Sequence, residues 1–338
     1  MSNHSLSRLI SRRYKMLVFD WDGTAVASRA GSVDHLLWRA EVLLGRGMWL
    51  AAVTGTNFAN LDRQFFSLLN PKVKTNLIAC VNRGSEVYGF DFRGRPVRLR
   101  AREATRAENE MMDEAVRMAQ RILAAEHGLE TRIISNRMNR RKLDIMPVPG
   151  WEDPSKERIG ELLDDTEKRL KAVGLEGIRS VIDLVARCSE EVGLYGRLTS
   201  DVKHVELGLT DKADSVEYLI EQIAKSRGID ADDILFIGDE FGTIGGCDGS
   251  DSMMITPKTE GASFISVGRE PEGVPPAVCH MGGGIESFAR ILDLQMDAWR
   301  DGREAASTGK GLAGGNLMLI PTEDNWGGLL YTSDAADE

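Results

Sequence analysis

The sequence predicts an α/β protein: a Rossmann-like, three-layer core built on a parallel sheet, with an inserted α+β cap domain. Two observations lead to this fold class. Several short apolar runs end in polar or glycine residues, and helical patterns separate them. Uninterrupted runs of this length are typical of strands that are buried on both faces. A long middle region instead alternates apolar and charged residues, which indicates a separate unit with half-exposed strands.

The buried strands of the core are expected at four runs: MLVFD (16–20), MWLAAVT (48–54), ILFIGD (234–239) and ASFISVG (262–268). Helical patterns lie between them, for example at 34–44 and 214–224. Alternation of buried strands and helices places helices on both faces of a mostly parallel sheet.

The middle region has its own signals. PVRLRAR (96–102) alternates apolar residues with arginine, the period of a strand with one covered face. Thr105 and Glu108 have the spacing of a capping box ahead of an amphipathic helix that stops near Gly128. A second helix is expected to open at Asp153-Pro154 and to close at Gly174.

These signals divide the chain into parts. Residues 1–84 and 205–298 are assigned to a discontinuous core, and 85–204 to the cap. Residues 299–328 are small, polar and glycine-rich, which is typical of a linker that leads into a further, truncated domain. The last ten residues, LLYTSDAADE (329–338), resemble a translated sequencing adapter, so we exclude them from the fold.

The amino-acid composition of the chain indicates which binding partners and which cellular location to expect. The chain has 338 residues, 42% of them hydrophobic and 28% charged, and a formal net charge of -10. This acidic balance argues against nucleic acid or an anionic membrane as a partner. The sequence has no apolar run of signal-peptide or membrane-span length, so we expect a cytoplasmic protein. Its four cysteines and five histidines are scattered, which argues against a zinc site or a disulfide framework.

Polar residues end three of the predicted strands. They are Asp20, Thr54 and Asp239. Because ligands of open α/β sheets bind beyond the carboxyl ends of the strands, we expect these side chains to face one crevice. Carboxylate and hydroxyl groups gathered there indicate a metal and an anion, and Mg²⁺ prefers oxygen ligands. Asp22 lies two residues beyond Asp20, on the same side of an extended chain.

Four motifs in this order resemble those of the haloacid dehalogenase superfamily of phosphatases: FDWDGT (19–24), VTGT (53–56), Lys212, and GDE (238–240) with Asp248 and Asp251 downstream. Their separation matches the subgroup whose cap is inserted between the second and third motifs. This subgroup includes Cof-type sugar phosphatases, sucrose and trehalose phosphatases, and eukaryotic phosphomannomutase. The resemblance spans about residues 14 to 295.

The resemblance implies roles for particular residues. Asp20 would attack phosphorus and form an aspartyl phosphate, and Asp22 would act as general acid and then as general base. Thr54 would donate a hydrogen bond to the phosphoryl group, and Lys212 would neutralise its charge. Mg²⁺ would be held by Asp20, Asp22 and the acidic residues of the last motif. Further phosphate or substrate contacts would come from Gly23, Thr24, Gly55, Thr56 and Asn57.

Lys212 also has a signal of its own. It lies in TDKADS, at the start of a predicted helix, where the helix dipole disfavours a cation by a few tenths to about 1 kcal/mol. A lysine at this position therefore indicates an anion nearby.

The partner of Asp239 at the metal is ambiguous in sequence. The sequence GGCD (245–248) resembles the GGND of phosphomannomutase and favours Asp248. Asp251 followed by Ser-Met-Met resembles the NDxxM of Cof-type enzymes, and Glu240 is a third candidate. We expect Asp248.

The cap is rich in arginine, above all at SNRMNRRK (135–142), which contains Arg140 and Arg141. A basic face over an acidic metal site would suit a sugar phosphate that carries a second charge. The alternative is an ordinary solvated sheet face.

The sequence therefore predicts a Mg²⁺-dependent phosphomonoester hydrolase that acts on a sugar phosphate or a similar small phosphorylated metabolite. One alternative is a phosphomannomutase-like sugar phosphomutase, which the GGCD text favours and the length of the chain disfavours. The other is a non-catalytic, regulatory domain that binds a phosphometabolite. The oligomeric state has no signal in the sequence.

Overall fold

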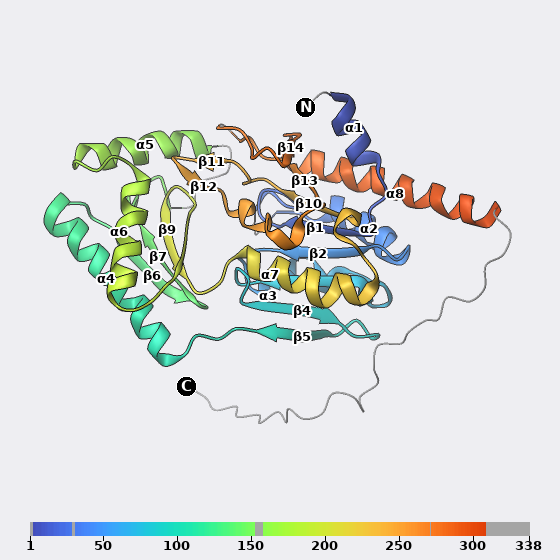
Figure 1. The fold of residues 1–338 in the computed structure, drawn as a ribbon, viewed down its shortest axis with the longest axis horizontal. Coiled ribbons are helices and arrows are strands. Elements are labelled where there is room, and N and C mark those ends of the chain that lie inside the picture. The colour runs from blue at the N-terminus through green and yellow to red at the C-terminus, as the bar shows by residue number, and fades with distance from the viewer. Residues whose placement is uncertain (1–2, 29–30, 153–157, 271, 309–338) are drawn as a thin grey trace. The chain divides into compact units, whose positions relative to one another are not determined.

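The computed structural model describes residues 3–28, 31–152, 158–270 and 272–308. Its main feature is an eight-stranded sheet in the order β14-β13-β10-β1-β2-β3-β4-β5 (Figure 1). From β14 to β3 all neighbours pair in parallel, and β4 and β5 add an antiparallel edge. The strands are β1 (Met16–Asp20), β2 (Trp49–Val53), β3 (Leu77–Val81), β4 (Glu86–Phe90), β5 (Pro96–Ala101), β10 (Ile234–Gly238), β13 (Ser263–Ser266) and β14 (Val278–His280).

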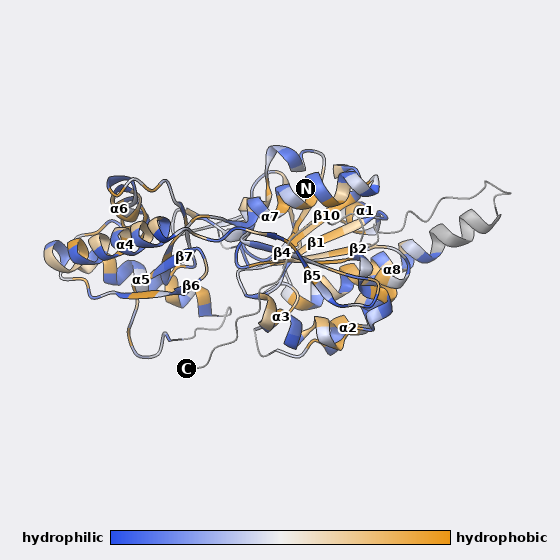
Figure 2. Ribbon diagram, turned by 90° about the horizontal axis from the view of Figure 1, so that it is seen from below, coloured by the Kyte–Doolittle hydropathy of each residue, from blue (hydrophilic) through white to orange (hydrophobic). Residues whose placement is uncertain are grey.

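Helices cover both faces of this sheet, as the sequence predicted. Successive residues of β1 enter different apolar cores: Leu17 and Phe19 pack in one core and Met16 and Val18 in the other. Figure 2 shows the hydrophobic strands lying between helices. The core helices are α1 (Asn3–Ser11), α2 (Asp34–Gly45), α3 (Phe58–Gln64), α7 (Lys212–Tyr218) and α8 (Gly284–Thr308). Short helical turns are η1 (Phe66–Leu68), η2 (Pro71–Asn76), η4 (Leu219–Ala224), η5 (Lys225–Arg227), η6 (Ala231–Asp233), η7 (Ser250–Met254) and η8 (Pro257–Thr259).

The inserted cap contains a four-stranded antiparallel sheet in the order β6-β7-β9-β8 and a separate apolar core. The predicted capping box is confirmed: Thr105 and Glu108 exchange both hydrogen bonds, and the helix ends at Gly128 in the left-handed conformation. The cap elements are α4 (Arg106–His127), β6 (Arg132–Arg137), β7 (Arg140–Asp144), α5 (Ile159–Ala172), α6 (Ile178–Glu191), β8 (Arg197–Ser200) and β9 (His204–Gly208). The predicted start of this second helix, at Asp153-Pro154, lies outside the described residues, and α5 is described from Ile159.

One cap helix, α6, was missing from the prediction. It starts after Gly177, which supplies no side-chain cap, so the usual start signal is absent. Instead, Glu167 on α5 accepts a hydrogen bond from the backbone N–H of Ile178 at 3.2 Å. A cap supplied by a neighbouring helix leaves no local pattern in the sequence.

Strand pairing moves the predicted limits of the cap. Residues 82–84 have positive φ angles and turn the chain from β3 into β4, so the hairpin β4–β5 extends the core sheet. The predicted cap start at residue 85 therefore places two core strands in the cap. PVRLRAR is half-exposed because it forms the sheet edge. At the other limit, β9 pairs with β7 and β8 in the cap sheet, beyond the predicted end at 204.

The end of the described chain is helical. α8 continues to Thr308, so it includes the first residues of the predicted linker. The remainder of that linker and the segment LLYTSDAADE lie outside the described residues. Gln295 on α8 accepts a hydrogen bond from the backbone N–H of Tyr14 at 3.1 Å. Among the helices of the described chain, none combines the length and the hydrophobicity that crossing a membrane requires.

Candidate active site

A buried lysine joins two buried carboxylates at the carboxyl end of the core sheet. Nζ of Lys212 lies 2.6 Å from Oδ1 of Asp20 and 2.5 Å from Oδ1 of Asp251. Asp20 ends β1, Lys212 begins α7, and Asp251 lies in η7. Three segments that are far apart in the sequence thus meet at one ammonium group.

Local structure explains the position of Lys212. Asp211 and Asp214 form a capping box, which fixes the start of α7 at Lys212. Burial lowers the pKa of Lys212, but the carboxylates of Asp20 and Asp251 outweigh burial and raise this pKa above its ordinary value. The helix dipole is therefore opposed by two anions, as the sequence indicated.

Asp20 has an environment dominated by burial and charge. Burial raises the pKa of its carboxyl group; Lys212 opposes this shift, and the charges of Asp251 and Asp239 reinforce it. The resulting pKa lies well above the ordinary value. A further cation near Asp20 would favour the ionised carboxylate.

Asp239 follows β10 and packs against the turn after β1. Oγ1 of Thr24 donates to Oδ1 of Asp239 at 3.1 Å. Gly23 has a φ of +97°, and a Cβ atom at this position would lie 2.3 Å from Oδ2 of Asp239. Glycine is therefore required here for both the backbone conformation and the approach of the carboxylate.

Oxygen atoms of Asp20, Asp239 and Asp251 lie within 4.8 Å of one another. Three carboxylates against the single ammonium of Lys212 leave an excess of negative charge in a largely buried space. Hard oxygen donors in this arrangement fit Mg²⁺, which takes carboxylate ligands and keeps water or phosphate oxygens in its other positions. These three residues are therefore the candidate metal ligands.

The expectation that Asp248 joins Asp239 is corrected by the structure. Residues between the two acids form the hairpin β11 (Thr243–Ile244) and β12 (Cys247–Asp248), in which Asp248 is exposed. Cys247 packs in the apolar core of the cap, so the hairpin leads away from the metal cluster. The chain then returns, and Asp251 occupies the position beside Asp20.

Two other acids proposed from the sequence lie outside the cluster of three. The side chain of Glu240 accepts a hydrogen bond from Oγ of Ser250 at 2.9 Å. Asp22 is partly buried in the turn after β1, where it forms an isolated bridge with Val26.

Thr54 follows β2 and begins a loop that the β3–β4 turn holds in place. Its Oγ1 accepts from the backbone N–H of Thr56 at 3.1 Å, which leaves the hydroxyl hydrogen for a ligand. Backbone N–H groups of Asn82 and Arg83 donate to the carbonyls of Thr56 and Thr54 at 2.8 and 3.0 Å. Asn57, a predicted phosphate contact, uses its side chain to cap α3 instead.

The two arginines singled out in the cap point in opposite directions, because successive residues of a strand face opposite sides of the sheet. NH2 of Arg140 donates to the carbonyl of Gly55, in the Thr54 loop, at 2.6 Å. Arg141 lies in the cap interior, where its side chain pairs with Asp113 at 2.5 Å. The structure thus brings Arg140 to the candidate site and gives Arg141 a place in the cap core.

Glu206, on β9, joins the cap to the core. It forms ion pairs with Arg83 of the β3–β4 turn and with Lys142, and its Oε2 lies 3.4 Å from NH1 of Arg140. Burial raises the pKa of Glu206, but Arg83, Lys142 and Arg140 outweigh burial and lower the pKa to about 2. No sequence motif marks this residue, because its partners come from distant segments.

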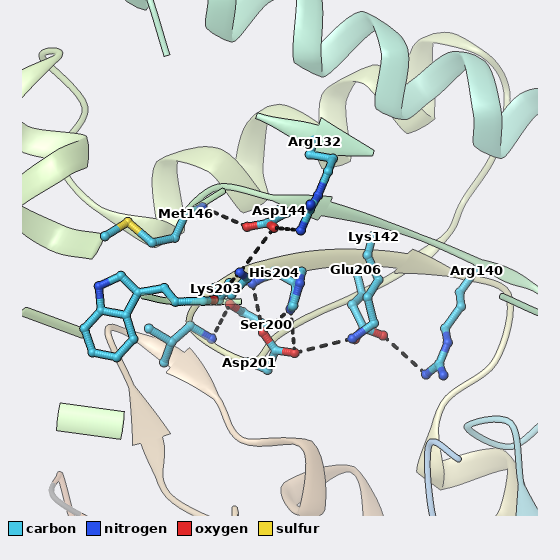
Figure 3. Close-up of polar contacts among 12 residues, drawn as sticks. Arg132, Arg140, Lys142, Asp144, Met146, Ser200, Asp201, Lys203, His204 and Glu206 are labelled. Carbon is cyan, nitrogen blue, oxygen red and sulfur yellow. Dashed lines mark hydrogen bonds and ion pairs between the residues drawn. The ribbon is translucent and has the colours of Figure 1, made fainter. Parts of the chain in front are cut away.

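Charged residues on one face of the cap sheet pair with one another (Figure 3). Besides the pairs at Glu206, Asp144 lies 2.9 Å from Arg132 and 3.3 Å from Lys203, and Lys142 lies 3.4 Å from Asp201. The expected basic face is therefore a mixed face of donors and acceptors.

Solved structures resemble the fold of this chain, although neither a protein-family model nor a curated protein sequence matches it. The C-terminal domain of trehalose-6-phosphate phosphatase from C. albicans superposes with a TM-score of 0.57 and 13% identity, over 88% of this chain and 98% of that chain. An IMP-bound mutant of the IMP-nucleotidase of Plasmodium falciparum gives a TM-score of 0.55 and 12% identity, over 87% and 70%.

The chain has the fold of the haloacid dehalogenase phosphatases. At 12 to 13% identity this likeness is one of fold. Within the haloacid dehalogenase fold, the cluster around Asp20 lies at the carboxyl end of the parallel strands, where ligands of such sheets bind.

Proposed function

We propose that this protein is a Mg²⁺-dependent phosphomonoester hydrolase whose nucleophile is Asp20. The observation that carries the proposal is the buried cluster in which Lys212 bridges Asp20 and Asp251, with Asp239 beside them. A nucleophilic carboxylate, a fixed cation and spare oxygen ligands are what the transfer of a phosphoryl group to an aspartate requires.

In the proposed reaction, each of these side chains has the role that the resemblance to the haloacid dehalogenase phosphatases implies. Asp20 attacks phosphorus in line and forms an aspartyl phosphate, while Asp22 gives a proton to the leaving alcohol. Asp22 then takes a proton from the water that hydrolyses this intermediate. Lys212 keeps Asp20 in place and the Thr54 hydroxyl donates to the phosphoryl oxygens. Bound Mg²⁺ would offset the repulsion between the carboxylate and the phosphate.

The polar cap face favours a small phosphorylated metabolite that is rich in hydroxyl groups, such as a sugar phosphate. Lys142, Glu206 and Arg140 present donors and acceptors of both charges, and mixed groups of this kind bind hydroxyls, which both donate and accept.

The mutase alternative loses its main support. It depended on GGCD and Asp248, and this aspartate lies exposed in the hairpin β11–β12. The non-catalytic alternative has no observation in its favour.

The test is turnover of p-nitrophenyl phosphate with Mg²⁺, with EDTA, and in the variant Asp20→Asn. We expect loss of activity with EDTA and in Asp20→Asn, while Asp248→Asn, an equivalent change at an exposed aspartate, retains activity. Full activity of Asp20→Asn would refute the mechanism. A panel of sugar and nucleoside monophosphates, assayed for phosphate release, then identifies the substrate class. Binding without release of phosphate would favour the regulatory alternative.

A further inference from the structure

We propose that Glu270 is a positioning residue for the metal site, which holds the backbone that carries Asp239. Glu270 lies in the loop after β13, away from every motif of the sequence, and its side chain is buried. This inference rests on the proposed function, because it assumes that the carboxylate cluster binds a divalent cation.

Four consecutive backbone N–H groups, at residues 239–242, are bound by two carboxylates. The groups at 239 and 240 donate to Oδ2 of Asp251 at 2.9 and 2.8 Å. The groups at 241 and 242 donate to Oε1 and Oε2 of Glu270 at 2.8 and 2.5 Å. Asp251 and Glu270 therefore accept hydrogen bonds from all four of these backbone N–H groups, in the turn by which the chain leaves β10.

This turn needs such acceptors. Beyond β10 the backbone has left the sheet ladder, and an unsatisfied buried N–H group costs about 1–3 kcal/mol. Hydrogen bonds from N–H groups to an ionised carboxylate are roughly twice as strong as neutral ones. A single side chain that binds two successive N–H groups also fixes their relative orientation, and hence the direction of the Asp239 side chain two residues earlier.

Glu270 is itself held firmly. Oγ of Ser266 donates to its Oε1 at 2.7 Å, and the same Oγ accepts from the backbone N–H of Gly268 at 3.2 Å. Its φ is +46°, a region that a glutamate rarely occupies without a functional constraint.

Glycines permit the loop that carries Glu270 to approach the backbone of residues 239–242 closely. A Cβ at Gly242 would lie 2.1 Å from Oε2 of Glu270, and one at Gly268 would lie 1.9 Å from the carbonyl oxygen of Asp239. Residues 266–270 therefore pack directly on the backbone of the metal-binding turn, and Glu270 acts through this backbone rather than on the metal.

The experiment measures Mn²⁺ binding to the full chain by electron paramagnetic resonance, without substrate. Glu270→Gln keeps the size of the side chain but places an NH₂ group against one of the two backbone N–H groups. We expect its Mn²⁺ dissociation constant to rise about 10- to 100-fold, the range found when residues that orient metal ligands are changed. The matched control is Glu272→Gln. Glu272 accepts a hydrogen bond from the backbone N–H of Gly245, at the hairpin tip, at 3.3 Å. We expect this control to keep the wild-type affinity.

The outcomes separate this inference from the proposed function. If the wild-type protein binds no Mn²⁺, both fail. If it binds Mn²⁺ and folded Glu270→Gln binds equally well, only the role of Glu270 is refuted, and Glu270 merely stabilises the loop. Should Glu270→Gln fail to fold, Ser266→Ala decides, because it retains the carboxylate and removes only the hydroxyl that orients it. A weaker affinity in Ser266→Ala supports the inference, and an unchanged affinity refutes it.

Discussion

Replacement of Glu206 by glutamine should destabilise the protein in a pH-dependent way. The carboxylate is buried between Arg83 and Lys142, with Arg140 nearby. Its pKa of about 2 in the folded protein compares with an ordinary value of 4.5. A depressed carboxyl pKa stabilises the folded state above the unfolded-state pKa, and this stabilisation is lost as the pH falls through the folded-state pKa.

The size of the effect follows from these two values. One pKa unit corresponds to 1.36 kcal/mol, so ionised Glu206 contributes about 3 kcal/mol to the free energy of unfolding at pH 7. Between pH 7 and pH 3, about 2 kcal/mol of this contribution is lost, because the unfolded chain binds the proton first. Loss of one partner from a buried ion pair costs a similar 3–5 kcal/mol.

The assay is urea unfolding of the wild type and of Glu206→Gln at pH 7 and at pH 3, followed by tryptophan fluorescence. The two proteins should differ by about 3 kcal/mol at pH 7 and by about 1 kcal/mol at pH 3. Glu103→Gln is the matched control, since Glu103 is exposed and its pair with Arg98 spans 3.4 Å; we expect a change below about 1 kcal/mol. A difference for Glu206→Gln that stays the same at both pH values would refute the reasoning.

Four further predictions concern the candidate metal site and the cap. Asp251→Asn should raise the Mn²⁺ dissociation constant at least about tenfold, whereas Asp248→Asn should leave it unchanged; equal effects in a Mn²⁺ titration would contradict the assignment. Gly23→Ala should weaken Mn²⁺ binding as well, because the residue has a φ of +97° and its new Cβ would collide with a carboxylate oxygen 2.3 Å away; unchanged affinity would show that the turn can relax. Arg141→Ala should lower the free energy of unfolding by about 3 kcal/mol, since it breaks a buried ion pair. Arg140→Ala should instead raise KM for the substrate. Steady-state kinetics and urea unfolding of both variants check this pair of predictions. A raised KM for Arg141→Ala together with a lower free energy of unfolding for Arg140→Ala would contradict them.

Much of the core could be predicted because its signals are local. Residues 16–20, 234–238 and 263–266 are apolar runs that end in polar or small residues, and all three form strands of the parallel sheet. A parallel strand that is buried on both faces consists almost entirely of apolar residues. Asp20 could be placed for the same reason, since a carboxylate that ends such a run must lie at the ligand-binding edge of the sheet.

The limits of the cap were harder to predict because they depend on which strands pair with one another. The same half-exposed alternation at 96–101 would suit an edge strand of the core sheet or a strand of a separate cap sheet. Only the hairpin with β4 places this strand in the core. Similarly, 204–208 is a buried run like the core strands, yet its partners are β7 and β8 of the cap.

The acid that accompanies Asp239 in the cluster is Asp251 and not the Asp248 that the sequence favoured. The sequence favoured Asp248 because GGCD resembles the GGND of phosphomannomutase, and both Asp248 and Asp251 lie at plausible distances along the chain from Asp239. Eleven residues lie between Asp239 and Asp251, and the hairpin within them reaches the apolar core of the cap through Cys247. Spacing alone does not distinguish a loop that stays at the site from one that leaves and returns.

This hairpin has a physical consequence for the candidate site. Its two ends are Gly242, held by Glu270, and Gly249, whose N–H donates to the carbonyl of Gly242 at 3.1 Å. Asp251 then binds the start of the same turn and also Lys212. A cation bound at the carboxylates would therefore act on a segment of backbone that also packs in the apolar core of the cap through Cys247.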